Sequence, residues 1–131
     1  YKEAHRDVTI RLHDSKDVPQ FNLDREQIKR VMINLLDNAI AAMDGKGEVV
    51  IDLSYNAGLQ MVKIEVADSG KGIPPENKMR LFEPYFSTKK QGTGLGLAIV
   101  NTIITDHNGF IRVHDNEPKG TKFIIELPVR V

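Results

Sequence analysis

Alternating apolar and polar residues predict five β-strands in this chain. Near the N-terminus, Val8, Ile10 and Leu12 alternate with polar residues, which is the period of a half-buried strand. The turn sequence Asn56-Ala57-Gly58 predicts a hairpin between the second and third strands. The later strands are expected over residues 48–54, 62–68, 110–114 and 121–127.

A long amphipathic helix is predicted between the first two strands. It begins after Asp24, a good N-cap with Gln27 at the third position after it, and it ends at Asp44-Gly45. Its apolar residues recur every three to four positions and form one broad face. They are Ile28, Val31, Met32, Leu35, Leu36, Ala39, Ile40 and Met43.

A second helix is predicted over residues 98–106, where Asn108-Gly109 ends the periodic pattern. The chain therefore reads strand, helix, two strands, a glycine-rich segment, helix and two strands. This order predicts an α/β (α+β) sandwich, with a mixed sheet of about five strands covered on one face by about three helices. We expect one domain over residues 1–131, in which residues 1–7 connect to a missing upstream domain.

Composition excludes several classes of function. The 18 basic and 18 acidic residues give a formal net charge of +0, so no global field favours nucleic acid or an anionic membrane. The absence of cysteine excludes disulfides, thiol catalysis and thiolate metal sites. No apolar run approaches the roughly 20 residues of a membrane span, and no membrane contact is expected of this domain.

Two glycine clusters bracket a segment with the composition of a lid. Residues 68–73 follow the third strand, and residues 92–97 open the second helix. Glycines let backbone approach a ligand closely, and free N–H groups at a helix start bind anions. The spacing fits neither a P-loop, which Gly70-Lys71 does not complete, nor a dinucleotide fingerprint, which needs Gly or Ala where Leu97 stands. We interpret the segment as a nucleotide pocket with a lid.

Three polar residues stand where packing alone favours apolar ones. Asp68 shares the strand parity of Val62 and Val66, so its carboxylate should point into the apolar layer and needs donors. Either the strand ends one residue earlier and Asp68 caps the turn, or a ligand amine supplies the donor. Asn34 and Asn38 lie one turn apart at the rim of the first helix face. They are either surface asparagines or amides that share a hard cation.

Five motifs in order resemble the Bergerat ATP-binding fold, shared by sensor histidine kinases, Hsp90, MutL and type II topoisomerases. They are an N box at 34–39, a G1 box at 68–73, an F box at 81–86, a G2 box at 92–97 and a closing Gly120-Thr121. The resemblance covers nearly the whole chain. The run from Phe82 to Lys89 and the G2 box are most similar to the catalytic and ATP-binding domain of two-component histidine kinases, especially the nitrogen-regulation sensors NtrB and NtrY.

The resemblance implies roles for single residues. Asp68 would accept a hydrogen bond from the adenine amine, which excludes guanine, and Asn38 would bind Mg²⁺ with Asn34 beside it. Lys89, or else Lys71 or Lys90, would neutralise phosphate charge, so that Asn34, Asn38 and Lys89 form the catalytic set. The other ATP contacts are expected from Gly70, Gly72, Ile73, Gly92, Thr93, Gly94, Leu95, Gly96 and Thr121.

Two departures from the family inform the mechanism. Hydrolytic relatives carry a glutamate where this chain has Asn34, and an amide is not a general base. This favours transfer of the γ-phosphoryl group to another nucleophile. Many kinases of the family also place a basic residue where Ala41 stands, so that phosphate contact comes from elsewhere or is missing. No histidine here is followed by the acidic-then-apolar pattern of a phosphoacceptor; the four are His5, His13, His107 and His114.

The resemblance therefore implies a partner. The acceptor histidine would lie in an upstream dimerisation domain, and a response regulator receiver domain would be an indirect partner. The cofactors would be ATP and Mg²⁺, the location the bacterial cytoplasm, and the isolated domain a monomer. Two alternatives stay open: an ATPase or protein-serine kinase of the same fold, and a non-catalytic nucleotide-sensing module.

Overall fold

The computed structural model describes residues 8–14, 24–44, 46–84 and 96–128. In this part the strands form one five-stranded sheet in the order β1-β2-β3-β5-β4. β1 runs parallel to β2, and the other neighbours pair antiparallel, so the sheet is mixed as predicted. The strands are β1 (Val8–Asp14), β2 (Gly47–Asn56), β3 (Met61–Asp68), β4 (Phe110–Asp115) and β5 (Thr121–Pro128).

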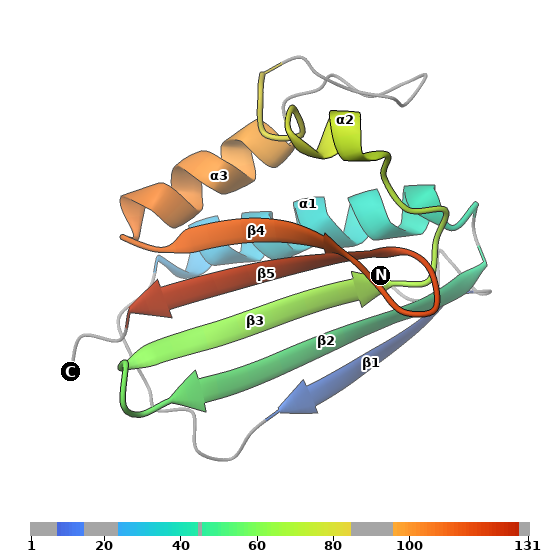
Figure 1. Ribbon diagram of the computed structural model, residues 1–131. Helices are drawn as coiled ribbons and strands as arrows, with labels where there is room; N and C mark the ends of the chain where they lie inside the picture. The colour runs from blue at the N-terminus through green and yellow to red at the C-terminus, as the bar shows by residue number, and fades with distance from the viewer. Residues whose placement is uncertain (1–7, 15–23, 45, 85–95, 129–131) are drawn as a thin grey trace.

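Helices cover one face of this sheet. α1 (Arg25–Ala42) and α3 (Gly96–Asp106) lie side by side on that face, and the one-turn α2 (Pro75–Lys78) lies near the start of α3 (Figure 1). The predicted α/β sandwich is confirmed. The helix expected over 98–106 begins two residues earlier, inside the second glycine cluster.

The helix ends follow the capping signals in the sequence. The Asp24 side chain accepts a hydrogen bond from the Gln27 N–H at 3.1 Å, which satisfies one free donor of the first turn of α1. At the end of α3, Asn108 takes a φ of 62°, and the Gly109 N–H donates to the Ile104 carbonyl at 2.9 Å. This left-handed residue turns the chain into β4.

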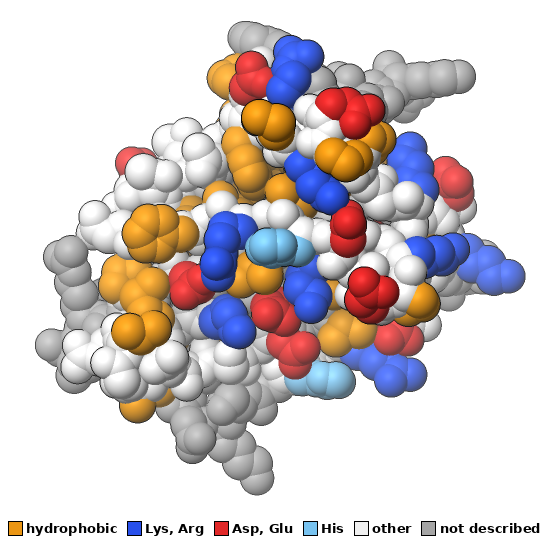
Figure 2. All heavy atoms as spheres, viewed as in Figure 1, with side chains coloured by type: hydrophobic (Ala, Val, Ile, Leu, Met, Phe, Trp, Pro, Cys, Tyr) orange, Lys and Arg blue, Asp and Glu red, His pale blue; other side chains and the backbone are white. Residues whose placement is uncertain are grey.

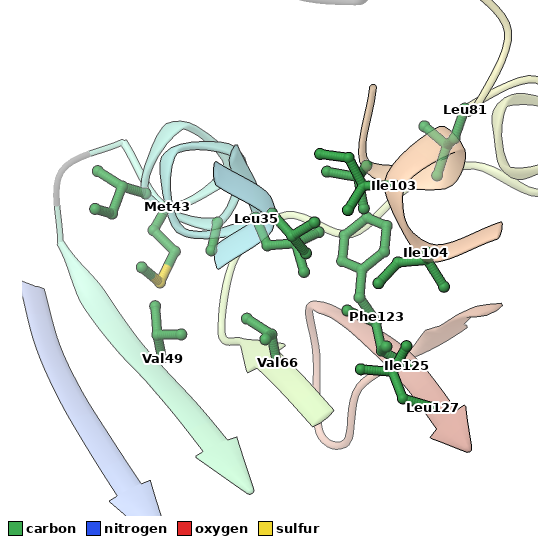
Figure 3. Packing of buried hydrophobic residues seen from close by; sticks show 14 of the residues in the cluster. Leu35, Met43, Val49, Val66, Leu81, Ile103, Ile104, Phe123, Ile125 and Leu127 are labelled. Carbon is green, nitrogen blue, oxygen red and sulfur yellow. The ribbon is translucent and has the colours of Figure 1, made fainter. Parts of the chain in front are cut away.

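The core fills the space between the helices and the sheet. Leu35 of α1 and Ile104 of α3 point toward Val66 and Ile125 of the strands (Figure 3). Leu35 and Ile125 have no exposed surface. Residues of β5 with odd numbers, from Thr121 to Leu127, are all buried, which fixes the register of β5 because one face of the sheet must meet the helices.

The opposite face of the sheet carries charged side chains. Figure 2 shows acidic and basic side chains interspersed over the strands rather than gathered by sign. Several form ion pairs, among them Arg11 with Glu48 at 3.4 Å and Arg112 with Glu126. Within the described ranges, no helix is both long and apolar enough to cross a membrane.

Candidate nucleotide-binding site

A pocket of about 920 Å³ lies at the end of the sheet where β3 finishes and β5 begins. In Figure 1 this is the end at which the β3 arrowhead meets the loop between β4 and β5. One wall comes from α1, with Asn34 and Asn38, and another from the segment after β3, with Gly72 and Ile73. The loop of residues 115–120 closes the remaining side. The first glycine cluster and the N box, far apart in sequence, therefore meet in one cavity.

Asp68 is the buried charge of this pocket. It is the last residue of β3 and has only 3% of its surface exposed, as the strand parity predicted. Its Oδ1 accepts hydrogen bonds from the backbone N–H groups of Gly70, at 2.8 Å, and Thr121, at 3.2 Å. No described residue donates to its other oxygen, Oδ2, which is open to the pocket. The carboxylate thus closes the turn and still offers one acceptor to a ligand.

Burial raises the pKa of Asp68 above its ordinary value of 3.8, because the apolar surroundings disfavour the charged form. The hydrogen bonds from the Gly70 and Thr121 N–H groups act in the opposite direction but are the smaller effects. A carboxylate that is short of donors and faces a cavity is a typical feature of a binding site.

The loop between β4 and β5 is attached to the end of β3. The Asn116 side chain donates to the Asp68 carbonyl at 2.8 Å, and the Asn116 N–H donates to the Gly120 carbonyl at 2.9 Å. Gly120 has a φ of +109°, and a Cβ there would lie 1.9 Å from the Asp68 carbonyl oxygen. Only glycine allows this approach, which brings the Thr121 N–H to the carboxylate.

Apolar side chains line the pocket beside Asp68. Ile73, Leu81 and Phe123 contribute this surface. The Phe82 ring packs edge-to-face on Phe123, with ring centroids 6.4 Å apart, which anchors this part of the lid segment to the core. An apolar slot beside a buried carboxylate acceptor suits a flat heterocycle that carries an exocyclic amine.

Asn34 and Asn38 both reach the pocket from α1. Both are half-buried, which favours the binding interpretation over that of two surface asparagines. Asn34 Nδ2 donates a hydrogen bond to the Gly96 carbonyl at 3.2 Å. Asn38 presents an amide toward the cavity from one turn farther along the helix. Ala41 lines the pocket as well.

The two glycines of the first cluster differ in position. Gly72 lines the pocket with a φ of +79°. Gly70 packs against the end of α1 instead, where a Cβ would lie 2.6 Å from the Ala42 carbonyl oxygen. The Lys71 N–H donates to that same carbonyl at 3.1 Å. Gly70 was expected to let backbone approach the base; it is not among the residues that line the pocket, and it packs the turn after β3 against α1.

The remaining expected residues divide into two groups. Ile73, Gly96 and Thr121 line the pocket, and so does Lys71, which was an alternative to Lys89. The others lie outside the described residues, and their roles stay predictions. They are Lys89, Lys90, Gly92, Thr93, Gly94 and Leu95.

Sequence reasoning missed most of the loop between β4 and β5. Asp115, Glu117 and Lys119 line the pocket, and Asp115 forms an ion pair with Lys78 at the end of α2. Asp37 and Asn77 were missed too. The only sequence signal for the loop was Gly120-Thr121, which marks where the loop ends but does not indicate that β5 lies beside β3.

Residues 23–131 match the family described as histidine kinase-, DNA gyrase B-, and HSP90-like ATPase. The chain belongs to this family. Among individual proteins, sensor histidine kinase ZraS of Escherichia coli K12 is 40% identical over 96% of this chain and 27% of ZraS. NtrB of Rhodobacter capsulatus, a sensory histidine kinase/phosphatase, is 39% identical over 81% of this chain and 33% of NtrB. The chain thus spans about a quarter of the length of ZraS.

Solved structures of this ATPase family agree with the sequence match. The catalytic domain of histidine kinase ThkA superposes with a TM-score of 0.87 at 37% identity, covering 98% of this chain and 84% of that domain. ThkA has also been solved in complex with the response regulator TrrA, with a TM-score of 0.83, 33% identity and coverage of 98% and 37%. ShkA, solved with AMPPNP, has a TM-score of 0.82, 28% identity and coverage of 95% and 26%. This chain is the ATP-binding catalytic domain of a sensor histidine kinase.

Proposed function

We propose that this domain binds ATP with Mg²⁺ in the pocket beside Asp68 and donates the γ-phosphoryl group to a histidine on a separate dimerisation domain. The phosphoryl group then passes to an aspartate of a response regulator receiver domain. Residues 1–131 would form one catalytic and ATP-binding unit that is joined to its acceptor domain upstream. The complex of ThkA with the response regulator TrrA supports the same relay here.

The observation that carries this proposal is the half-satisfied carboxylate of Asp68. Oδ1 is held by two backbone N–H groups, so the carboxylate cannot turn away from the cavity. Oδ2 then offers one fixed acceptor, which selects a base with an amine at that position. The carbonyl of guanine would face a carboxylate there and would leave both groups without a donor. Adenine therefore fits the site and guanine does not.

The residues of the pocket also fit a magnesium ion. The donor set supports this, because Asn38 brings an amide oxygen to the cavity and Mg²⁺ takes oxygen ligands from few side chains and from substrate phosphates. Among the described residues, no group of three or more His, Asp or Glu side chains is arranged to hold a metal alone. When bound, Mg²⁺ would neutralise phosphate charge. Asn38 would hold it, and α1 fixes the position of Asn38.

Transfer rather than hydrolysis is supported by Asn34. It occupies the helix position, one turn before Asn38, where hydrolytic relatives carry a glutamate. Its amide cannot take a proton from water, and its N–H group is already bonded to the Gly96 carbonyl. The domain thus positions ATP for an external nucleophile.

A phosphotransfer assay tests this function. ATP labelled in its γ-phosphate is incubated with Mg²⁺ and the domain, with and without the dimerisation domain of the same protein. We expect acid-labile, base-stable label on the added domain, because a phosphohistidine has this stability. Steady release of free phosphate without labelled protein would make the domain an ATPase. ATP binding with neither transfer nor hydrolysis would make it a nucleotide-sensing module.

Replacing Asn38 tests the magnesium site. We expect Asn38→Ala to lower the affinity for ATP in Mg²⁺ about tenfold, the effect of losing one ligand contact of about 1.4 kcal/mol, and to leave the affinity in EDTA unchanged. Calorimetric titration with and without Mg²⁺ measures both values. Asn101→Ala is the matched control, since Asn101 is a half-buried helix asparagine that does not line the pocket. A full Mg²⁺ dependence in Asn38→Ala would place the ion on other residues.

A further inference from the structure

A hydrogen bond between Asn34 and Gly96 joins α1 to the start of α3, at the end of the pocket where the phosphates of ATP would lie. Asn34 lies in the middle of α1, and Gly96 is the first residue of α3. The distance from Asn34 Nδ2 to the Gly96 carbonyl oxygen is 3.2 Å. A carbonyl oxygen only accepts hydrogen bonds, so the NH₂ end of the amide must face Gly96. The contact therefore depends on the N–H group of Asn34, not on its oxygen.

This contact matters because of what the start of α3 offers. The first turn of a helix has N–H groups without partners inside the helix, and Gly96 and Leu97 line the pocket. A Cβ on Gly96 would have no neighbour within 4 Å, so packing around that position is open. The hydrogen bond from the Asn34 amide thus sets where these N–H groups lie relative to α1.

We propose that Asn34 is a positioning residue, which acts through its N–H group by holding the start of α3 against α1, and that it does not ligate the metal. The hydrogen bond from Asn34 to Gly96 fixes the position of the first turn of α3, which would receive the phosphates, relative to Asn38, one turn along α1. The inference rests on the proposed binding of ATP in this pocket. It replaces the expectation that Asn34 helps Asn38 to hold Mg²⁺.

The variant Asn34→Asp separates the two roles, because it keeps the size of the side chain and exchanges the N–H donor for an oxygen. A metal ligand at this position would keep or gain Mg²⁺ affinity as a carboxylate. A positioning residue would lose its contact, since a carboxylate would then face the Gly96 carbonyl oxygen. We expect the affinity for AMPPNP and for ADP to fall about tenfold, equally with Mg²⁺ and in EDTA.

Two further variants complete the test. Asn34→Ala removes the same donor without adding charge, and we expect a similar loss, so the test stands even if the aspartate variant folds poorly. Asn101→Asp adds the same charge on α3 outside the pocket and should bind as the wild type does.

Calorimetry decides the outcome. Wild-type affinity in Asn34→Asp, or a loss that appears only when Mg²⁺ is present, would overturn the positioning role. A wild-type domain that binds no nucleotide would instead overturn the proposed function, so the two failures are distinguishable. In the phosphotransfer assay, we expect Asn34→Ala to raise KM for ATP more than it lowers kcat.

Discussion

Asp68→Asn is expected to lower the affinity for ATP and ADP about a hundredfold, because the amide replaces the free acceptor with a donor. The amide oxygen can still accept from the Gly70 and Thr121 N–H groups, so the turn should be preserved. Its NH₂ group then takes the place of Oδ2. This group and the amine of adenine are both donors, so no hydrogen bond forms between them. Calorimetric titration measures the loss.

The same variant should change the choice of base. An NH₂ group at the Oδ2 position can donate to the carbonyl of guanine, so we expect the ratio of ATP to GTP affinity to fall in Asp68→Asn. Glu65→Gln is the matched control, because Glu65 is a carboxylate of the same strand that does not line the pocket. Unchanged ATP affinity in Asp68→Asn would remove Asp68 from the adenine site.

Asp68→Asn is also expected to unfold no more easily than the wild type at neutral pH. Burial raises the folded-state pKa of Asp68 above 3.8, so the folded protein favours the protonated form. The stability that Asp68 contributes is fully present below pH 3.8 and is lost as pH rises through the raised pKa. The asparagine variant lacks this titration, and its free energy of unfolding relative to wild type should therefore rise from acid to neutral pH. Urea unfolding across this range measures the difference, and a difference independent of pH would contradict the account. The wild type thus retains a destabilising charge for the sake of binding.

Gly120→Ala is expected to lower the free energy of unfolding by about 3 kcal/mol or more, the second large effect. The added Cβ would lie 1.9 Å from the Asp68 carbonyl oxygen, and the φ of +109° is strained for alanine. Relieving this clash would push β5 away from β3 and move the Thr121 N–H away from Asp68. Nucleotide affinity should fall together with stability, because the acceptor is oriented by that N–H group.

Gly58→Ala is the matched control for this glycine. Gly58 lies in the turn between β2 and β3, and a Cβ there meets only the Asn56 Oδ1 at 3.4 Å, an ordinary contact. We expect a change within about 0.5 kcal/mol, which is typical of surface substitutions. Urea unfolding of both variants makes the comparison. Equal losses would show that the close approach at Gly120 is not what holds the loop.

Much of the fold could be predicted from the sequence. Period-two alternation predicted all five strands of the described sheet, and the 3.6-residue period and the capping residues Asp24 and Asn108 placed the two long helices within two residues. Strand parity also predicted that Asp68 is buried, since side chains alternate strictly between the faces of a strand. The strand does not end one residue earlier, because β3 includes Asp68, but one oxygen of Asp68 still caps the turn while the other faces the pocket.

The strand order could not be predicted in this way. Alternation shows which face of a strand is buried but not which strand is its neighbour. β5 pairs with β3 although their facing ends, Asp68 and Thr121, are 53 positions apart in the sequence. That pairing brings the loop of residues 115–120 into the pocket and makes Gly120 essential to it. The hydrogen bond from Asn34 to Gly96 could not be predicted from the sequence either, because it depends on how α1 and α3 pack together.

A crystal structure of the domain with AMPPNP and Mg²⁺ would show where the base, the ion and the Asn34 amide lie. We expect adenine in the slot beside Ile73 and Phe123, with its exocyclic amine donating to Asp68 Oδ2. We also expect the ion on Asn38 Oδ1 and the Asn34 amide still bonded to Gly96. A base bound elsewhere, or an Asp68 carboxylate that contacts no part of the nucleotide, would show that the pocket beside Asp68 is not the adenine site.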